Sequence, residues 1–320
     1  MGEERRYRTR KKKRTGLKVT LFILLAVLVA GGVYLFNVYR HVNNATEEIY
    51  KPVAEGEVDS IRGSAVTLSS KEPISILLLG VDSGDLGRTE QGRSDSMMVA
   101  TINPNTKKTT LTSISRDTYT EIIGYGTWDK INHAYAFGGT GMSINTVQNF
   151  LDIPIDYYVT VNMAGIQEIV DAVGGIEVVS PLTFSFGGYQ FYEGEVARLD
   201  GASALAFARM RYEDIDGDIG RQARQRLVIE GVIDKVISPS TLFNYQDILG
   251  SLSNNVQTNF QMADYMQLQS NDYLAAAGNI VSQTISGDGG YLDDGIWYFF
   301  VPDEEQDRIQ TLLRTELEID

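Results

Sequence analysis

The chain has 320 residues, 43% of them hydrophobic and 22% charged, a composition typical of a globular protein large enough for a substantial core. Its net charge of −14 argues against nucleic acid as a partner of the folded part. The absence of cysteine excludes disulfides and a cysteine nucleophile.

The N-terminal segment differs from the rest of the chain. Residues 1–18 contain nine of the 28 basic residues, and the next 21 residues, 19–39, carry no charge. At about 1.5 Å per residue, a helix of this length matches the hydrocarbon core of a membrane. A cleaved signal peptide is the alternative, but the apolar run is long for one and no small-residue cleavage site follows it. We therefore expect a basic cytoplasmic tail over 1–18 and a transmembrane signal anchor over 19–39.

The basic residues also predict the orientation of this anchor. Because they precede the span, the positive-inside rule keeps the tail in the cytoplasm and places residues 40–320 outside the cell. We expect a single-pass protein of the cell membrane with an extracellular C-terminal domain. From His41 onward the chain has 18 basic and 40 acidic residues, so any local cluster of positive charge there is informative.

The first half of the exported part reads as alternating strands and helices. Residues 40–72 are polar and mixed, which predicts a stalk or accessory segment. The run SILLLGVD then predicts a buried strand, and a hairpin joins the two strands that follow it. The expected strands cover 75–82, 96–104, 109–115, 157–162 and 175–180, and the expected helices cover 144–152 and 164–175. This alternation predicts an α/β/α layered domain with a central mixed sheet flanked by helices.

The second half is expected to be largely helical. The clearest helix of the chain covers 218–238, where apolar residues recur every four positions, and Pro239 ends it. Residues 239–320 read as further helices around a hairpin-like segment. We therefore expect a core domain over 73–238 and a C-terminal helical extension over 239–320 that packs on or after it.

Half of the 18 basic residues from His41 onward lie in four short stretches, near predicted strand ends or helix starts. They are Arg88, Arg93, Arg116, Lys130, Arg209, Arg211, Arg221, Arg224 and Arg226. In open α/β sheets such ends converge on the ligand crevice, and guanidinium groups bind phosphate oxygens in pairs. The set would suit a ligand with more than one phosphate. The alternative is a solvated network with the local acids, which are Asp117, Glu213, Asp214 and Asp216.

The start of helix 218–238 carries part of this set. Asp218, Arg221 and Gln225 share one face, with Arg224 beside them, and a helix N-terminus itself favours an anion. Asp218 has the alternative role of an N-cap.

Carboxylates lie on both sides of the loop between the first two strands. Asp82 and Asp85 follow the first strand, and Asp95 precedes the second. Two carboxylates with substrate phosphates and water commonly hold Mg²⁺, although ordinary loop and cap aspartates are the alternative. The stretch DIDGDIG fails as an EF-hand loop because Ile219 and Gln225 stand where Gly and Glu are needed. With only two histidines in the chain, a histidine zinc site is excluded.

These segments together resemble the LytR–CpsA–Psr family of bacterial cell-wall glycopolymer transferases. The matching stretches are LLLGVD, GRSDSMMVATINP, TSISRDTY, KINHAYAFGG, IDYYVTVNMAGIQEIVDAVGGIEV, LDGASALAFARMRY and DIGRQARQR. They occur in the family's order over roughly residues 73–238, which the resemblance makes the catalytic domain.

The resemblance implies an enzyme that takes a glycopolymer, such as a teichoic acid or capsular polysaccharide, from a polyprenyl-pyrophosphate carrier. It would attach the polymer to peptidoglycan through a phosphodiester, usually at the muramic acid 6-hydroxyl. Asp82 and Asp95 would hold Mg²⁺, with Asp85 the alternative to Asp82. The residues implied as catalytic are Arg93, Arg116, Arg209, Arg211 and Asp218. Substrate contacts are expected from Lys130, Arg221, Arg224 and Gln225, together with Arg88 of the loop.

Two other hypotheses use the same residues. A pyrophosphatase would replace the sugar hydroxyl with water, and a non-catalytic, membrane-anchored receptor or regulator of wall polymers would bind without turnover. In each case the lipid tail needs an apolar pocket, for which helices 144–152 and 164–173 are candidate walls. The expected partners are the polyprenyl-linked glycan donor, peptidoglycan and the membrane.

Overall fold

The computed structural model describes residues 49–54, 57–59, 61–82, 92–236, 255–270 and 272–319. The expected tail, the apolar stretch 19–39, Asp85 and Arg88 lie outside these residues. Among the helices of the described ranges, none is both long and apolar enough to cross a membrane.

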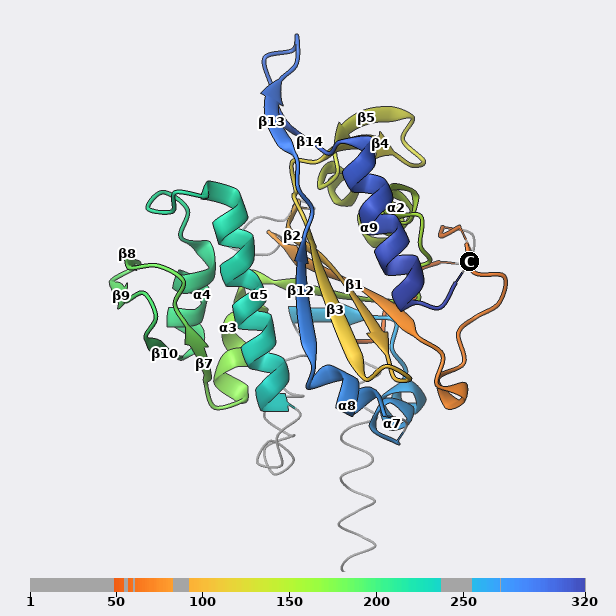
Figure 1. Ribbon diagram of the computed structural model, residues 1–320, viewed down its shortest axis with the longest axis horizontal. Coiled ribbons are helices and arrows are strands. Elements are labelled where there is room, and N and C mark those ends of the chain that lie inside the picture. The colour runs from red at the N-terminus through yellow and green to blue at the C-terminus, as the bar shows by residue number, and fades with distance from the viewer. Residues whose placement is uncertain are drawn as a thin grey trace, which may run out of the picture. The chain divides into compact units, whose positions relative to one another are not determined.

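A six-stranded mixed sheet forms the centre of the domain (Figure 1), in the order β11-β6-β1-β2-β3-β12. The strands are β1 Ile74–Val81, β2 Ser94–Asn103, β3 Lys108–Ile114, β6 Tyr157–Asn162, β11 Val256–Thr258 and β12 Ile280–Thr284. β1 is parallel to β6 and antiparallel to β2, and β3 is antiparallel to β2 and parallel to β12. The carboxyl ends of β1, β3, β6 and β12 therefore meet at one edge of the sheet, beside the start of β2.

The apolar run in β1 follows from burial on both faces of the sheet. Successive side chains of a strand point to opposite faces. Leu77 and Leu79 belong to one core cluster, whereas Ile76 and Leu78 face another. The strands expected over 75–82, 96–104, 109–115 and 157–162 are confirmed, with ends shifted by one or two residues.

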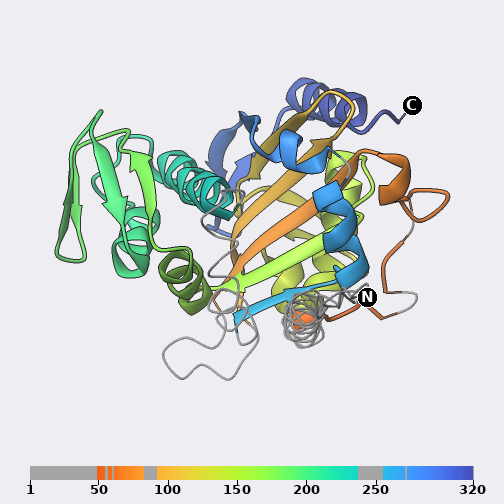
Figure 2. The same ribbon diagram turned by 90° about the horizontal axis from the view of Figure 1, so that it is seen from below.

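Helices cover both faces, which confirms the expected layered α/β architecture. Helices α2, His133–Leu151, and α9, Asp303–Glu316, pack their apolar side chains into the first core cluster. The opposite face is covered by part of α5, Gly217–Val236, and by the segment of α7, Met262–Ser270, and α8, Tyr273–Ala277. Figure 2 shows the sheet from below with helices on its two sides.

A second, smaller core lies beside the sheet. Helices α3, Met163–Ala172, and α4, Gly201–Arg209, pack there with α5. Four short strands cover them, β7 Ile176–Val179, β8 Phe184–Phe186, β9 Tyr189–Phe191 and β10 Val196–Leu199. The strand expected over 175–180 is thus present, but it pairs with β10 and not with the central sheet. These elements are drawn in green at the left of Figure 1.

Two hairpins flank the sheet edge where the carboxyl ends meet. One consists of β4, Tyr119–Ile122, and β5, Thr127–Lys130; the other consists of β13, Asp288–Tyr291, and β14, Trp297–Phe300. A β-bridge between Thr118 and Phe299 joins them.

Helix ends depend on side-chain contacts as well as on local pattern. The expected N-cap of α3 is confirmed, because Asn162 Oδ1 accepts the Gly165 N–H at 2.7 Å. Helix α2 begins at His133, well before the expected start at 144, and includes a break at Gly138 and Gly139. The two glycines interrupt the apolar periodicity, so the sequence pattern does not predict the first turns of α2. Burial of Ala134 and Tyr135 holds these turns in place.

The C-terminal part adds strands to the central sheet, whereas the sequence predicted a helical extension there. Alongside helices α7, α8 and α9 it supplies β11 and β12, the two edge strands of the central sheet. Both strands are short and partly polar, VQT and IVSQT, so their patterns are weak and only pairing with β6 and β3 defines them.

Candidate active site

The candidate site lies at the sheet edge where the carboxyl ends of the parallel strands meet. Asp82 follows β1, Arg116 follows β3, and Asp95 is the second residue of β2. The Asp82 N–H donates to the Arg93 carbonyl at 3.0 Å, which holds the end of β1 against the start of β2. Four predicted residues from three chain segments are thereby brought to one edge, as expected for a ligand crevice in an open sheet.

Arg116 forms the centre of a charged cluster. Its Nη1 donates to Asp95 Oδ1 at 2.6 Å, and its Nε lies 3.6 Å from Asp117 Oδ2. Asp117 Oδ1 in turn accepts a hydrogen bond from Lys130 Nζ at 2.6 Å. Burial lowers the pKa of Arg116, but attraction from Asp95, Asp218 and Asp117 outweighs it and raises that pKa above its ordinary value.

Helix α5 adds Arg221 and Asp218 to this cluster. Arg221 Nη2 lies 2.6 Å from Asp218 Oδ1, and Gln222 Nε2 donates to Asp218 Oδ2 at 3.1 Å. Burial lowers the pKa of Arg221, and repulsion from Arg116 and Arg211 lowers it further against the attraction of the nearby carboxylates. Asp218 lies within the first turn of α5, whose first residue is Gly217, so it is not the N-cap.

Several polar atoms of this cluster are buried without a hydrogen-bond partner among the described residues. They are Arg116 Nε, Arg221 Nε and Gln225 Oε1, whereas Arg221 Nη2 and Asp218 Oδ1 face each other as an ion pair. Buried donors left in this way normally cost free energy, so native proteins satisfy them with protein, water or ligand. Unused guanidinium donors point to an anion as the missing partner.

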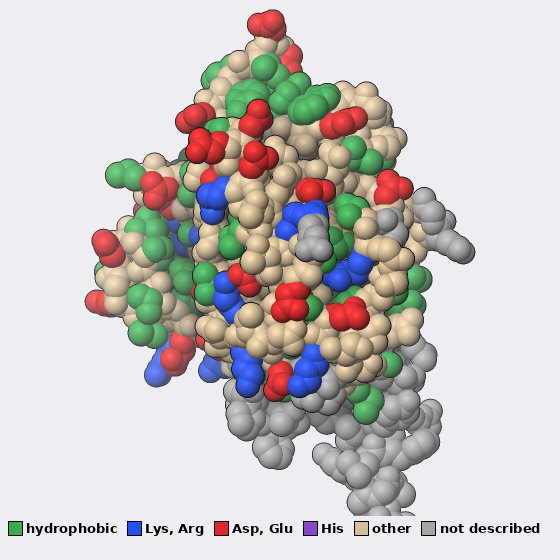
Figure 3. Space-filling view, turned by 45° about the vertical axis from the view of Figure 1, so that its right-hand side comes forward, with side chains coloured by type: hydrophobic (Ala, Val, Ile, Leu, Met, Phe, Trp, Pro, Cys, Tyr) green, Lys and Arg blue, Asp and Glu red, His purple; other side chains and the backbone are tan. Residues whose placement is uncertain are grey.

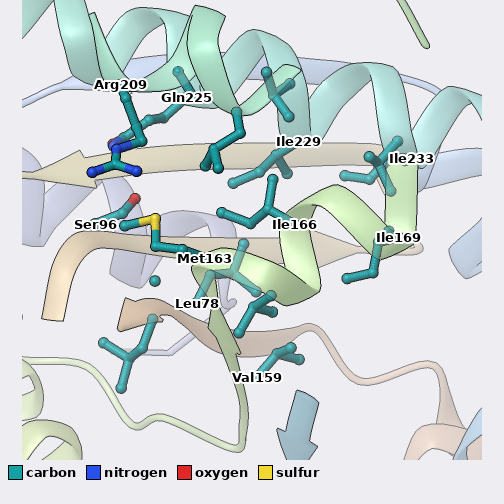
Figure 4. Close-up of a pocket in the computed structure, with 17 residues that line it drawn as sticks. Leu78, Ser96, Val159, Met163, Ile166, Ile169, Arg209, Gln225, Ile229 and Ile233 are labelled. Carbon is teal, nitrogen blue, oxygen red and sulfur yellow. The ribbon is translucent and has the colours of Figure 1, made fainter. Parts of the chain in front are cut away.

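An apolar pocket of about 320 Å³ opens beside this cluster (Figure 4), between helices α3 and α5 and the strands β1 and β6. Its apolar lining includes Leu78, Val159, Val161, Met163, Ile166, Ile169, Val228, Ile229, Val232 and Ile233. Arg209 and Gln225 lie together at one end of the pocket, across from Ser96. Because Ser96 follows Asp95 directly on β2, the pocket and the charged cluster are adjacent.

Of the two helices expected to line an apolar pocket, one lines it and the other does not. Helix α3 lines it, as expected for 164–173, through Ile166 and Ile169. The segment 144–152 is instead the second half of α2 and packs Ile144, Val147 and Phe150 into the core on the opposite face of the sheet. Its apolar residues belong to the ordinary core of the domain.

Arg224 occupies a different position from the one expected for a substrate contact. Its side chain is fully buried. Its Nε donates to the Phe207 carbonyl at 3.1 Å, and its two terminal nitrogens bind the Met210 carbonyl and the Asp214 carboxylate. With its donors used in this way, Arg224 holds the loop after α4 against α5.

Gly220 leaves space for the Asp214 carboxylate that binds Arg224. A Cβ at Gly220 would lie 2.0 Å from Asp214 Oδ2, closer than side-chain atoms can approach. The glycine therefore allows the Asp214 carboxylate to lie against α5 and reach Arg224.

The remaining predicted arginines take separate places. Arg93, Arg209 and Arg211 are exposed around the cluster and the pocket mouth. Arg226 Nη1 donates to Ser113 Oγ of β3 at 2.7 Å and so links α5 to the sheet. The alternative of local ion pairs therefore holds for Asp214 with Arg224 and for Asp117 with Lys130 and Arg116, whereas Arg116 Nε and Arg221 Nε make no hydrogen bond to the described residues.

Two carboxylates of the kind expected for a Mg²⁺ site lie at this edge of the sheet. Asp82 directly follows β1 and Asp95 lies on the neighbouring strand β2, at the same sheet edge, and both are partly exposed. No group of three His, Cys, Asp or Glu residues in the described ranges could hold a metal ion by itself. Two carboxylates therefore leave coordination positions for phosphate oxygens and water, which is the usual way in which proteins hold Mg²⁺.

The part of the apolar lining that α5 supplies was missed by sequence reasoning. On α5, Ile229 and Ile233 continue an i+4 row that begins at Gln225, a residue already assigned to the site. An apolar row starting from a predicted anion-binding residue is the signal that could have revealed the pocket wall.

Fold and site together define an α/β domain with an apolar pocket beside a cluster of arginines and carboxylates, an arrangement suited to an amphiphilic anion. A sequence profile of the LytR_cpsA_psr family matches residues 36–315. The chain belongs to this family.

Relatives and solved structures agree with this assignment. A protein of Enterococcus faecalis named polyisoprenyl-teichoic acid–peptidoglycan teichoic acid transferase TagU is 46% identical over 93% of this chain and 95% of its own length. The crystal structure of B. subtilis TagU covers 78% of this chain and 99% of its own at 41% identity, with a TM-score of 0.64. A structure of TagT bound to LIIa-WTA covers 84% and 100% at 28% identity, with a TM-score of 0.71. The chain is accordingly an enzyme of the transferase class.

Proposed function

We propose that this enzyme moves a glycopolymer of the teichoic acid type from a polyprenyl-pyrophosphate carrier to peptidoglycan, forming a phosphodiester. The observation that carries the proposal is the apolar pocket with unused guanidinium donors beside its mouth. A prenyl chain suits the pocket and a pyrophosphate suits the arginines, so one ligand satisfies both halves of the site. The names of the relatives supply the polymer and the acceptor.

The proposed reaction is a phosphoryl transfer. A hydroxyl oxygen of the acceptor sugar attacks the phosphorus that carries the glycan, and the bond from that phosphorus to the bridging oxygen breaks. The bridging oxygen keeps the electron pair and leaves as polyprenyl phosphate. Such reactions depend mainly on positioning and charge stabilisation, for which arginines at the pocket mouth are suited.

We assign separate tasks to the residues of the cluster. Arg116 and Arg221 bind the pyrophosphate oxygens, with Arg93, Arg209 and Arg211 around them and Gln225 at the pocket mouth. Asp218 orients Arg221 and takes the proton of the attacking hydroxyl. Lys130 holds Asp117 and through it Arg116.

Asp82 and Asp95 are the proposed ligands of Mg²⁺. When bound there, the ion would neutralise charge on the phosphate oxygens. Asp95 also accepts the hydrogen bond from Arg116, so it places that guanidinium beside the phosphates.

The test uses the full chain in detergent with Mg²⁺, a polyprenyl-pyrophosphate glycan and a peptidoglycan oligomer, with products read by mass spectrometry. We expect an adduct joined through a phosphodiester. Asp95→Asn and Arg211→Ala should lower its rate about 100-fold or more. Arg198→Ala is the matched control, because this arginine lies on β10 and its side chain is 85% exposed. Hydrolysis of the donor without an adduct would contradict transfer and favour a pyrophosphatase, whereas binding without turnover would favour a receptor.

We also propose that residues 19–39 anchor the enzyme in the cell membrane with the catalytic domain outside. An anchor would keep the site near a donor carried by lipid and so raise its effective concentration. Protease added to intact cells should digest the C-terminal domain and spare an epitope placed before residue 19. Protection of the C-terminal domain would contradict this orientation.

A further inference from the structure

A cluster of aromatic side chains with one exposed ring lies next to the charged cluster. It consists of the exposed Trp128, the half-buried Tyr119 and Phe300 and the buried Tyr298, and is called here the aromatic face. The Tyr119 ring lies 5.5 Å from that of Trp128, 5.0 Å from that of Tyr298 and 5.6 Å from that of Phe300, measured between centroids. Trp128 is 58% exposed, whereas aromatic rings of this size usually contribute to the stability of a protein by being buried. Backed by the three other rings, the Trp128 ring offers a firmly held apolar face to a ligand.

The aromatic face is continuous with the candidate active site. Trp128 and Lys130 are two residues apart on β5, so they share a face of the strand and lie about 7 Å apart along it. Lys130 Nζ lies 5.7 Å from the centroid of the Tyr298 ring and donates to Asp117, whose carboxylate lies beside Arg116. A ligand on Trp128 would therefore extend past Lys130 to Arg116 and Asp95.

The charges around the aromatic face favour an uncharged ligand. Glu121 is paired with Trp128 across the hairpin, and Asp129 follows Trp128. Lys130, which is already bound to Asp117, is the one basic residue in β4, β5, β13 and β14. Figure 3 shows hydrophobic side chains near the top of the molecule, where these strands lie, with acidic side chains around them. A polymer with many phosphates would be repelled here.

Sugar rings match such a surface chemically. The axial C–H bonds of a pyranose form an apolar face with slightly positive hydrogens, and the face of an indole ring is electron-rich. A ring stacked on Trp128 would leave its hydroxyl and acetamido groups at the edge, where the neighbouring polar side chains lie.

We propose that the aromatic face is the binding site of the acceptor, an uncharged chain of N-acetylated sugars with one ring stacked on Trp128. The proposal rests on the proposed function and extends it by giving donor and acceptor separate sites. The lipid donor enters from the pocket, whose mouth includes Ser96, and the acceptor enters across Lys130. Asp95 and Arg116 lie between the two. Attacking and leaving oxygens that arrive from different sides suit the in-line geometry of phosphoryl transfer.

The test measures sugar binding and transfer separately on the full chain in detergent. Binding of chitotetraose, an uncharged chain of four N-acetylglucosamine units, is measured by calorimetry without donor. We expect Trp128→Ala to weaken this binding about tenfold and Trp128→Phe to restore most of it. Tyr125→Ala is the matched control, because Tyr125 is 56% exposed on the same hairpin but stacks on Phe137 of α2 at 4.1 Å. Binding of polyprenyl pyrophosphate should be the same in all four proteins.

The outcomes separate this proposal from the proposed function. Transfer with an acceptor KM raised only in Trp128→Ala supports both. Chitotetraose binding that depends on Trp128, in a protein that transfers nothing, supports the sugar site and contradicts the transferase reaction. If Trp128→Ala binds chitotetraose as the native protein does, or if Tyr125→Ala loses as much affinity, the aromatic face is not the acceptor site, whatever the transfer assay shows.

Discussion

Two regions of helix α5 use the same residue type in opposite ways. In the charged cluster beside the pocket, Arg221 is nearly buried and its Nη2 is paired with Asp218, yet its Nε has no hydrogen-bond partner among the described residues. One turn along the helix, in the contact with the loop after α4, Arg224 is fully buried and its donors are bound by Phe207, Met210 and Asp214. A buried guanidinium with its donors in use stabilises the fold, whereas one with unused donors is prepared for a ligand.

The largest expected effect is on the satisfied arginine. Arg224→Ala leaves the Asp214 carboxylate buried without its cation, so the free energy of unfolding should fall by about 3–5 kcal/mol. Urea denaturation followed by circular dichroism measures the loss. Arg226→Ala is the control, because Arg226 makes a single hydrogen bond to Ser113, and its loss should cost about 1 kcal/mol. Equal stability of the two variants would show that Arg224 does not fasten the loop.

The unsatisfied arginine should behave in the reverse way. Arg221→Ala should lower the transfer rate about 10²–10³-fold, because a donor aimed at the reacting phosphates is lost. Its midpoint in urea should fall less than that of Arg224→Ala, because among the described residues Arg221 pairs with the Asp218 carboxylate, whereas Arg224 also binds two backbone carbonyls. A variant that unfolds as readily as Arg224→Ala while its folded fraction keeps full activity would remove the distinction between the two regions.

Gly220 offers a sharper test of the fastened loop. A Gly→Ala change inside a helix normally stabilises it by up to about 1 kcal/mol. At this position the new Cβ would collide with the Asp214 carboxylate, so we expect a loss of about 1–3 kcal/mol instead. Gly63→Ala, where a Cβ meets nothing within 4 Å, is the control and should be close to neutral. A gain in stability in Gly220→Ala would contradict the close packing of Asp214 on α5.

The smallest effect concerns the pocket alone. Ile233→Glu places a charge in the apolar lining, far along α5 from the arginines, and should weaken binding of a long polyprenyl pyrophosphate about tenfold. Binding of a short-chain analogue that reaches only the mouth should change little. Val236→Glu is the matched control, since Val236 is 47% exposed and does not line the pocket. If both chain lengths lose affinity equally, the prenyl tail does not occupy this pocket.

Local pattern was sufficient for the layered architecture and for much of the charged cluster. The run SILLLGVD predicts β1 because both of its faces are buried, and Asn162 caps α3 as its position before an apolar helix indicates. Arg116 and Asp95 were assigned to the site from their places at strand ends, and the antiparallel pairing of β1 with β2 and of β2 with β3 brings them within 2.6 Å of each other. Such inferences succeed because strand direction alone places these ends at one edge of the sheet.

Tertiary packing decided the remainder. Nothing local distinguishes Arg224 from Arg221, because they lie one turn apart on one helix and only their neighbours across the fold decide which donors are used. The edge strands β11 and β12 carry weak patterns and are defined by the strands beside them. An apolar row on α5 predicts burial, but periodicity cannot tell a filled core from an open pocket. Whether Ile229 and Ile233 meet side chains or leave space depends on how far α3 and α5 lie from the sheet, and that separation is a property of the assembled fold.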